Sequence, residues 1–290
     1  MKGLLLAGGL GTRLTPITIG VSKQLMPIYD KPMIYYPLTT LILSGAREIG
    51  IITNPEQKSG FENLLGDGSQ WGLNIKYLEQ HEPNGIAEAY LIGEDFLEGS
   101  ASGLALGDNL FHGAGLGTSL STTPHTLGAK ILGSRVSNPS DYGVAVLAKD
   151  GTVREIVEKP STYVSDVAIP GLYFLDATAS DRAKRLSPST RGELEIADLL
   201  TSYLQDSSLA LNLLPRGTVW LDTGTIDSLS EASDYVRVVQ KRQGKLIGSP
   251  EEASWRLGLI DNAQLLSLAK KQDRSAYGQY LFELLGHSND

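Results

Sequence analysis

Short apolar segments recur along the chain, and several of them end at glycine or at a charged residue. They lie at residues 4–7, 49–53, 75–78, 103–106, 143–147, 171–175 and 211–214. Apolar runs of this length that are bounded by turn residues are typical of strands buried on both faces. Residues 152–157 alternate between apolar and polar instead, which indicates a strand with one buried face.

Between these segments lie stretches with apolar residues at helical spacing. Residues 36–44 show this spacing before Gly45, and residues 85–92 show it before Gly93. Short strands that alternate with helices predict an α/β fold with an open, mostly parallel, Rossmann-like sheet and helices on both faces. Ligands of such sheets bind beyond the carboxyl ends of the strands.

The character of the chain changes near residue 228. Apolar residues then recur at helical spacing, and residues 264–271 are helical in pattern too. The chain is therefore expected to have a core at residues 1–227 and a C-terminal helical extension at residues 228–290. Residues 277–285 carry many apolar groups for the end of a chain. We expect them to pack on the core or to form a subunit interface.

Composition narrows the possible functions. The chain has 290 residues and a net charge of -8, so it lacks the excess of cations that non-specific nucleic-acid binding requires. It has no cysteine, which excludes disulfides, thiolate metal sites and cysteine nucleophiles. Four histidines without paired spacing disfavour a histidine-built metal site. No secretory signal or membrane-spanning run is evident, so a soluble cytoplasmic protein is expected.

A glycine-rich segment directly follows the first predicted strand. Gly8, Gly9 and Gly11 would let backbone N–H groups approach an anion, and Arg13 adds a forked charge suited to phosphate. A plain tight turn is an equally good explanation of the glycines alone. A dinucleotide-binding loop is disfavoured because Leu14 stands where the third glycine is needed. The chain also has no Gly-Lys-Ser or Gly-Lys-Thr of a Walker loop.

Charged residues follow several of the predicted strands. Asp108 and Asp222 each end an apolar run, and two such carboxylates could hold Mg²⁺ against phosphate oxygens. Aspartate also serves as a helix cap or turn residue, and the sequence does not show that the two converge. Lys23 lies on a loop before a proline, and Glu158 and Lys159 end another strand. Each of these could equally be an ordinary solvated residue.

Many motifs in a fixed order match one enzyme family. They are GGLGTRL at 8–14, SKQ at 22–24, YDKPMIYY at 29–36, LGDG at 65–68, GDN at 107–109, VEKP at 157–160, GLY at 171–173, RGELEI at 191–196 and WLDTGT at 220–225. With these motifs the chain resembles the sugar-nucleotide pyrophosphorylases, and among them the bacterial enzymes that use thymidine nucleotides. The resemblance covers nearly the whole chain and implies their nucleotidyltransferase fold.

The resemblance also implies a reaction. dTTP and glucose 1-phosphate would give dTDP-glucose and pyrophosphate, with Mg²⁺ as cofactor, as the first step of dTDP-L-rhamnose synthesis. The attacking phosphate oxygen is already anionic, so neither a serine–histidine nor a cysteine–histidine pair is needed. The site must instead neutralise and align two anions that repel each other. Members of this family suggest a homotetramer and feedback inhibition by dTDP-rhamnose.

The resemblance also implies roles for individual residues of this chain. Arg13, Lys23 and Lys159 would be catalytic, and Asp108 and Asp222 would bind the metal. The nucleotide would contact Gly8, Gly9, Gly11, Thr12, Arg13, Gln24, Gln80, Pro83 and Gly85. The sugar phosphate would contact Lys23, Asn109, Tyr142, Gly143, Glu158, Lys159, Ile169, Gly171 and Trp220.

Three positions depart from the family pattern. Asn84 stands where aspartate is common, Glu88 where glutamine is common, and Pro170 within a segment that often reads Val-Thr. The first two affect the expected contacts with the base. A related enzyme for another base or sugar stays an alternative. A non-catalytic sugar-nucleotide sensor is disfavoured, because the charged residues of the family motifs are all present.

Overall fold

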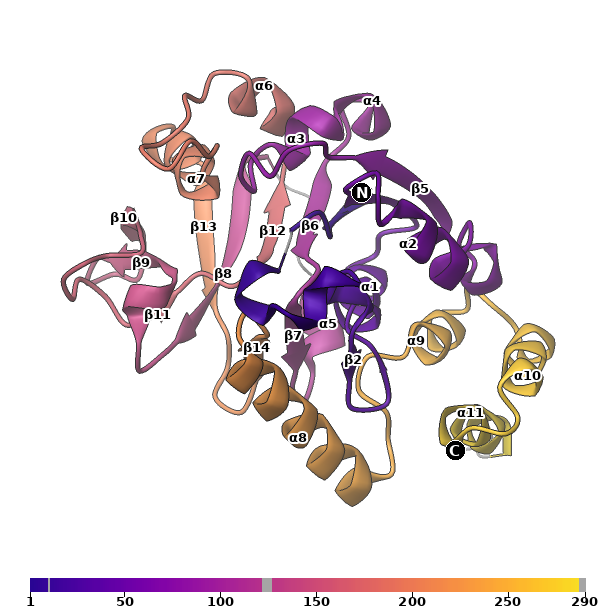
Figure 1. The fold of residues 1–290 in the computed structure, drawn as a ribbon. Helices are drawn as coiled ribbons and strands as arrows, with labels where there is room; N and C mark the ends of the chain where they lie inside the picture. Colours follow the sequence, from indigo (N-terminus) through magenta and orange to yellow (C-terminus); the bar gives the residue numbers. More distant parts are fainter. Residues whose placement is uncertain (10, 122–126, 287–290) are drawn as a thin grey trace.

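The computed structural model describes residues 1–9, 11–121 and 127–286, so Leu10 of the glycine-rich segment and residues 287–290 of the predicted extension lie outside the described residues. One large sheet runs through the molecule in the order β10-β9-β11-β8-β12-β6-β1-β4-β5, and β13 also pairs with β8 (Figure 1). Its strands are β1 (Lys2–Leu6), β4 (Glu48–Thr53), β5 (Asn74–Glu79), β6 (Ser102–Leu106), β8 (Ala129–Arg135), β9 (Gly143–Leu147), β10 (Val153–Glu158), β11 (Val167–Ala168), β12 (Leu172–Leu175) and β13 (Leu209–Leu213).

Two small strand pairs and a set of helices complete the described fold. The pairs are β2 (Pro27–Ile28) with β3 (Lys31–Pro32), and β7 (Asn109–His112) with β14 (Val219–Asp222). The helices are α1 (Tyr35–Leu43), α2 (Lys58–Leu65), α3 (Ala89–Ile92), α4 (Glu94–Leu97), α5 (Leu116–Ser121), α6 (Ala179–Ala183), α7 (Ile196–Gln205), α8 (Ile226–Gln243), α9 (Pro250–Arg256), α10 (Asn262–Lys271) and α11 (Ala276–Gly286).

The sheet combines a parallel part with antiparallel additions. Strands β6, β1, β4 and β5 are parallel to one another, and β13 is parallel to β8. Strand β12 runs antiparallel between β6 and β8, and β9, β10 and β11 pair antiparallel at the far end. The predicted open α/β sheet is confirmed, and the apolar segments of the sequence coincide with its strands. The antiparallel pairings carry no local sequence signal.

Helices cover both faces of the sheet, as predicted. Along β1, Leu4 packs into a cluster with residues of α3, α4, α6 and α7, whereas Leu5 packs into a cluster with residues of α1 and α2. The two side chains are fully buried. Successive residues of a strand point to opposite faces, so a strand covered on both sides must be apolar throughout. This explains the uninterrupted apolar runs of the sequence.

The predicted helix at residues 85–92 is wrong in its first half. Helix α3 begins only at Ala89. Gly85 has a φ of +107°, outside the helical region, and its backbone packs tightly against Leu194. The N–H of Ala87 donates to the carbonyl of Leu194 at 3.1 Å instead of entering a helical turn. Residues 85–88 therefore form a loop held by a distant segment, which periodicity along the chain does not reveal.

Four helices, joined by short loops, make up the described chain after residue 225. Thr225 caps the start of helix α8: its side chain accepts from the N–H of Ser228 in a capping box. Gly244, in a left-handed conformation, caps the other end of the helix. Helices α9, α10 and α11 lie together at one side of the molecule (Figure 1). Their apolar side chains join the cluster under α1, and Leu281 is fully buried there. The predicted division of the chain at residue 227 stays a prediction.

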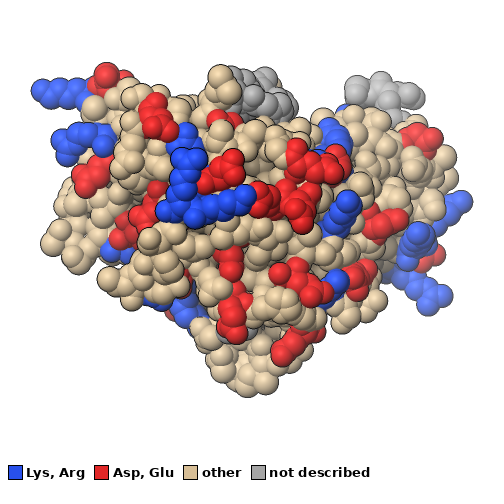
Figure 2. All heavy atoms as spheres, turned by 90° about the horizontal axis from the view of Figure 1, so that it is seen from above, with Lys and Arg blue, Asp and Glu red and all other residues tan. Residues whose placement is uncertain are grey.

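The surface mixes charges of both signs. Figure 2 shows basic side chains lying among acidic ones on the face that it presents. None of the described helices combines the length and the apolar character that crossing a membrane would require. The cytoplasmic location stays a prediction.

We expect Leu281→Ala to lower the free energy of unfolding by about 2–5 kcal/mol, because it leaves a cavity in a packed cluster. Leu257→Ala is the matched control, since Leu257 is 40% exposed and its truncation should cost within about 0.5 kcal/mol. Denaturant unfolding of both variants measures the difference. Equal losses would show that α11 is not packed on the core as described.

Candidate functional site

A cavity of about 300 Å³ lies at the carboxyl ends of β1 and β6. Leu6 and Leu106, the last residues of these strands, form part of its floor. The carboxyl ends of parallel strands in open α/β sheets are where ligands bind. The predicted site residues that line this cavity are Gly9, Arg13, Gln24, Asp108, Asn109, Tyr142, Gly143, Glu158, Lys159, Ile169, Gly171, Trp220 and Asp222.

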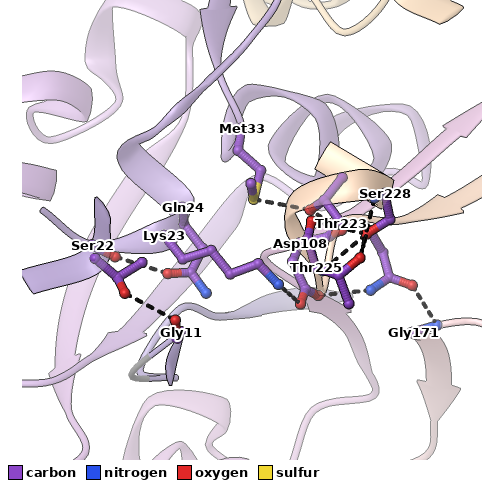
Figure 3. A network of polar contacts seen from close by, with 12 residues as sticks. Gly11, Ser22, Lys23, Gln24, Met33, Asp108, Gly171, Thr223, Thr225 and Ser228 are labelled. Carbon is purple, nitrogen blue, oxygen red and sulfur yellow. Dashed lines mark hydrogen bonds and ion pairs between the residues drawn. The ribbon is translucent and has the colours of Figure 1, made fainter. Parts of the chain in front are cut away.

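The pairing of β7 with β14 brings the two predicted metal ligands together. Asp222 lies opposite Asn109 in the antiparallel register, so it is next to Asp108 although the two are far apart in the sequence. Thr223 fastens this junction: its N–H and its hydroxyl both donate to the carbonyl of Asp108, at 3.2 and 2.9 Å (Figure 3). The convergence that the sequence left open is therefore a consequence of this strand pair.

Lys23 reaches Asp108 from a separate short 3₁₀ turn, Lys23–Leu25. Its Nζ lies 2.5 Å from Oδ2 of Asp108, and its side chain is buried (Figure 3). Burial alone would raise the pKa of Asp108. The charge and hydrogen bond of Lys23, together with a hydrogen bond from Asn109, outweigh burial and lower the pKa of Asp108 below its usual value. Asp108 is therefore ionised at neutral pH.

The pKa of Asp222 is shifted in the opposite direction, above its usual value. Burial, followed by the negative charge of Asp108, raises the pKa of Asp222. The charge of Lys23, a backbone hydrogen bond from Gly224 and the charge of Arg13 counteract this only in part. Its Oδ1 is buried and makes no hydrogen bond to any residue that the structure describes. A buried carboxylate oxygen without a donor fits a bound cation, which would supply the missing positive charge.

The glycine-rich segment brings a second cation to the two carboxylates. Gly11 has a φ of +61°, which favours glycine, and the carbonyl of Gly11 accepts from the hydroxyl of Thr18 at 2.9 Å. Arg13 follows in a short 3₁₀ turn, Thr12–Leu14. Its guanidinium lies so close to Gly224 that a side chain on that residue would meet both Arg13 and Asp222. Arg13 and Asp222 thus flank the same point of the cavity.

Asn109 connects the carboxylates to the other wall of the cavity. Its Oδ1 accepts from Nε1 of Trp220 at 2.6 Å and from the N–H of Gly171 at 3.0 Å. Its Nδ2 donates to Oδ1 of Asp108 at 2.8 Å. The ring of Trp220 packs at 4.9 Å from the ring of Tyr142. Through these hydrogen bonds, Asn109 connects Asp108 to a cavity wall that is built from three separate segments.

The far wall carries Glu158 and Lys159 at the end of β10. Burial raises the pKa of Glu158, against the charges of Lys159 and Arg191. Lys159 is half-exposed and has a φ of +40°, an uncommon conformation for a lysine. Arg191 lies 3.4 Å from Glu158 and 2.8 Å from Glu195. The sequence motif contained Arg191, but nothing in the pattern assigned it to the site.

The remaining predicted residues are not among the described lining residues. A side chain on Gly11 would meet the stem of Lys23, and one on Gly8 would collide with the amide of Gln80. Thr12 and Pro83 are exposed. Gly85 packs against another loop and is not among the described lining residues. The cavity also has apolar lining residues that sequence reasoning missed, namely Leu6, Ile86, Leu106, Ile156, Tyr173, Ile196 and Ala197.

The fold and this site define a class of enzyme. Residues 2–238 match the family model described as nucleotidyl transferase. A solved structure from Bacillus anthracis, determined with bound sucrose, has a TM-score of 0.75, 37% sequence identity, and coverage of 82% of this chain and 95% of that one. A UDP-glucose pyrophosphorylase solved with UDP-glucose shares the fold, with a TM-score of 0.72 at 24% identity and coverage of 83% and 99%. The chain belongs to the nucleotidyl transferase family, and it is an enzyme.

Its relatives narrow the class further. A glucose-1-phosphate thymidylyltransferase of Mycolicibacterium smegmatis is 52% identical over 285 residues, which cover 98% of this chain and 99% of the relative. Relatives of the same name in Mycobacterium tuberculosis and Xanthomonas campestris are 50% and 52% identical, each over 98% of this chain and over 99% and 96% of their own lengths. Within the family, the chain groups with the glucose-1-phosphate thymidylyltransferases.

We expect Asn109→Ala to destabilise the protein and the site together. The buried N–H of Gly171 would lose its acceptor, at a cost of about 1–3 kcal/mol in the free energy of unfolding. Asn212→Ala is the matched control, because Asn212 is exposed on β13. Denaturant unfolding measures both variants. A loss no larger than that of the control would show that the Asn109 hydrogen bonds do not hold the cavity wall.

Proposed function

We propose that this enzyme joins dTTP and glucose 1-phosphate to give dTDP-glucose and pyrophosphate. One observation carries the proposal: a single cavity is lined by Arg13 and Lys159 and by the carboxylates of Asp108 and Asp222, and Lys23 pairs with Asp108 behind this lining. Such a set suits two phosphate-bearing substrates, which need positive charge on several sides. The name shared by its relatives supports the choice of substrates.

The chemistry requires alignment more than proton transfer. An oxygen of the sugar phosphate forms a bond to the α-phosphorus of dTTP, while the bond from that phosphorus to the β-phosphate oxygen breaks. The electron pair leaves with pyrophosphate. Because the attacking oxygen is already anionic, no general base is needed. The protein contributes by holding both anions in line and by neutralising their repulsion.

We assign each cation to a different phosphate group according to its position in the site. Arg13, on the glycine-rich side, would hold the triphosphate and the departing pyrophosphate. Lys159, on the opposite wall, would bind the phosphate of the sugar. Lys23 would stabilise charge near the reacting phosphorus while it keeps Asp108 ionised. Tyr142, Trp220 and the other predicted sugar-phosphate residues would enclose the sugar between these cations.

Asp108 and Asp222 would hold Mg²⁺. Mg²⁺ is commonly bound by one or two carboxylates plus substrate phosphates and water. The described residues fit that pattern: they offer these two acids, but no cluster of three or more metal-binding side chains. A bound magnesium ion would neutralise phosphate charge that Arg13 and the lysines leave uncompensated. The unpartnered Oδ1 of Asp222 supports this assignment.

The wider context rests on the family resemblance. We propose that the reaction is the first step of dTDP-L-rhamnose synthesis in the cytoplasm. We also propose that the enzyme is a homotetramer subject to feedback inhibition by dTDP-rhamnose. A related enzyme with another base or sugar is the alternative, and a substrate panel separates the two.

A pyrophosphate-release assay over a panel of nucleoside triphosphates and sugar 1-phosphates, with and without Mg²⁺, tests the proposal. We expect the highest kcat/KM with dTTP and glucose 1-phosphate, and turnover only with the metal. Preference for another pair would favour the alternative. No pyrophosphate release from any pair would contradict nucleotidyl transfer.

Lys159→Ala should raise the KM for glucose 1-phosphate much more than the KM for dTTP, because only the sugar phosphate meets this lysine. We expect at least about a tenfold difference between the two effects, as for the loss of one charged hydrogen bond. Lys149→Ala is the control and should change neither constant, because Lys149 is an exposed lysine in the turn at the opposite end of the β9–β10 pair. Equal effects of Lys159→Ala on both substrates would reject the assignment.

A further inference from the structure

Gln80 is held by a carboxylate that the proposed reaction does not use. It directly follows β5 and is buried, and its Oε1 lies so near Gly8 that a side chain on residue 8 would collide with it. Its Nε2 donates to Oε2 of Glu88 at 2.7 Å. The other oxygen of Glu88, Oε1, accepts from Nδ2 of Asn84 at 2.8 Å. The amide of Gln80 therefore has a fixed neighbour on one side and the glycine-rich segment on the other.

These contacts decide which way the Gln80 amide faces. A deprotonated carboxylate can only accept hydrogen bonds, so the group that faces Glu88 must be the NH₂ of Gln80. The amide oxygen then faces away from Glu88 and toward Gly8. The same reasoning orients Asn84, whose NH₂ faces the second oxygen of Glu88. Glu88 thus sets the direction of two amides that could otherwise be turned over.

The direction of the Gln80 amide matters for the choice of base. In thymine and uracil, N3 carries a hydrogen, whereas N3 of cytosine carries a lone pair. An amide oxygen accepts from the first and is repelled by the second. Sites built to pair with a substrate N–H reject analogues that lack it, because a buried polar group is then left unpaired.

We propose that Glu88 is a positioning residue for base selection: it holds Gln80 with its oxygen toward the nucleotide, so that bases with a hydrogen on N3 are preferred. This inference rests on the proposed function, with Gln80 among the nucleotide contacts that the family resemblance implies. Glu88 acts through Gln80 and needs no contact with the base.

The hydrogen-bonding requirements suggest one variant that frees the Gln80 amide to face either way and a second variant that restores its direction. In Glu88→Gln, the new amide can accept or donate, so Gln80 can face either way. Adding Asn84→Asp places an obligate acceptor beside that new amide and takes up its NH₂. The amide oxygen at position 88 then faces Nε2 of Gln80, and the original direction returns with the carboxylate moved to position 84.

The experiment measures kcat/KM for dTTP and for dCTP, each with glucose 1-phosphate. Glu88→Gln should lower the dTTP-to-dCTP ratio by at least about tenfold, which is the scale of one misdirected hydrogen bond. The double variant Asn84→Asp/Glu88→Gln should recover the wild-type ratio. Glu82→Gln, which removes an exposed carboxylate from the same loop, is the matched control and should leave the ratio unchanged.

An active Glu88→Gln variant with the wild-type ratio would overturn the inference, and so would a double variant as unselective as the single one. If Glu88→Gln does not fold, Glu88→Ala removes the acceptor in another way and should lower the ratio too; an unchanged ratio would again overturn the inference. A wild-type enzyme that turns over neither dTTP nor UTP would instead contradict the proposed function.

Discussion

The site depends on holding two carboxylates side by side in a partly buried place. The register of β7 with β14 puts Asp222 next to Asp108, and their mutual repulsion contributes to the raised pKa of Asp222. Lys23 compensates one of the two charges, as its ion pair with Asp108 lowers the pKa of that acid. The remaining negative charge suits a metal ion and, through it, a triphosphate.

The rest of the fold supports this arrangement from several directions. Parallel strands β1 and β6 end at the floor of the cavity, and helices pack on both faces of the sheet. The glycine-rich segment after β1 brings Arg13, and the turn Lys23–Leu25 that follows later brings Lys23. The antiparallel end of the sheet brings Glu158 and Lys159. In the proposed reaction, one phosphate-bearing substrate would enter this cavity from the side of each part.

Much of this could be predicted from the sequence, because buried strands and glycine turns leave strong local signals. The apolar runs located the strands, and the two strand-end acids Asp108 and Asp222 both line the cavity. The meeting of Asp108 with Asp222 depends on a strand pair whose register has no local signal. The same holds for Arg191, which reaches Glu158 from another segment, and for Gly85, whose loop conformation is set by contact with Leu194.

The most direct test of the account is a calorimetric titration of dTTP into the protein, with and without Mg²⁺. We predict that the metal tightens binding to the wild type by at least about tenfold, which corresponds to about 1.4 kcal/mol, and that it does not do so in Asp108→Asn/Asp222→Asn. The control Glu56→Gln/Glu231→Gln, which removes two exposed carboxylates, should behave as the wild type. An equal effect of Mg²⁺ on dTTP binding in the double aspartate variant would contradict the central role of the two carboxylates.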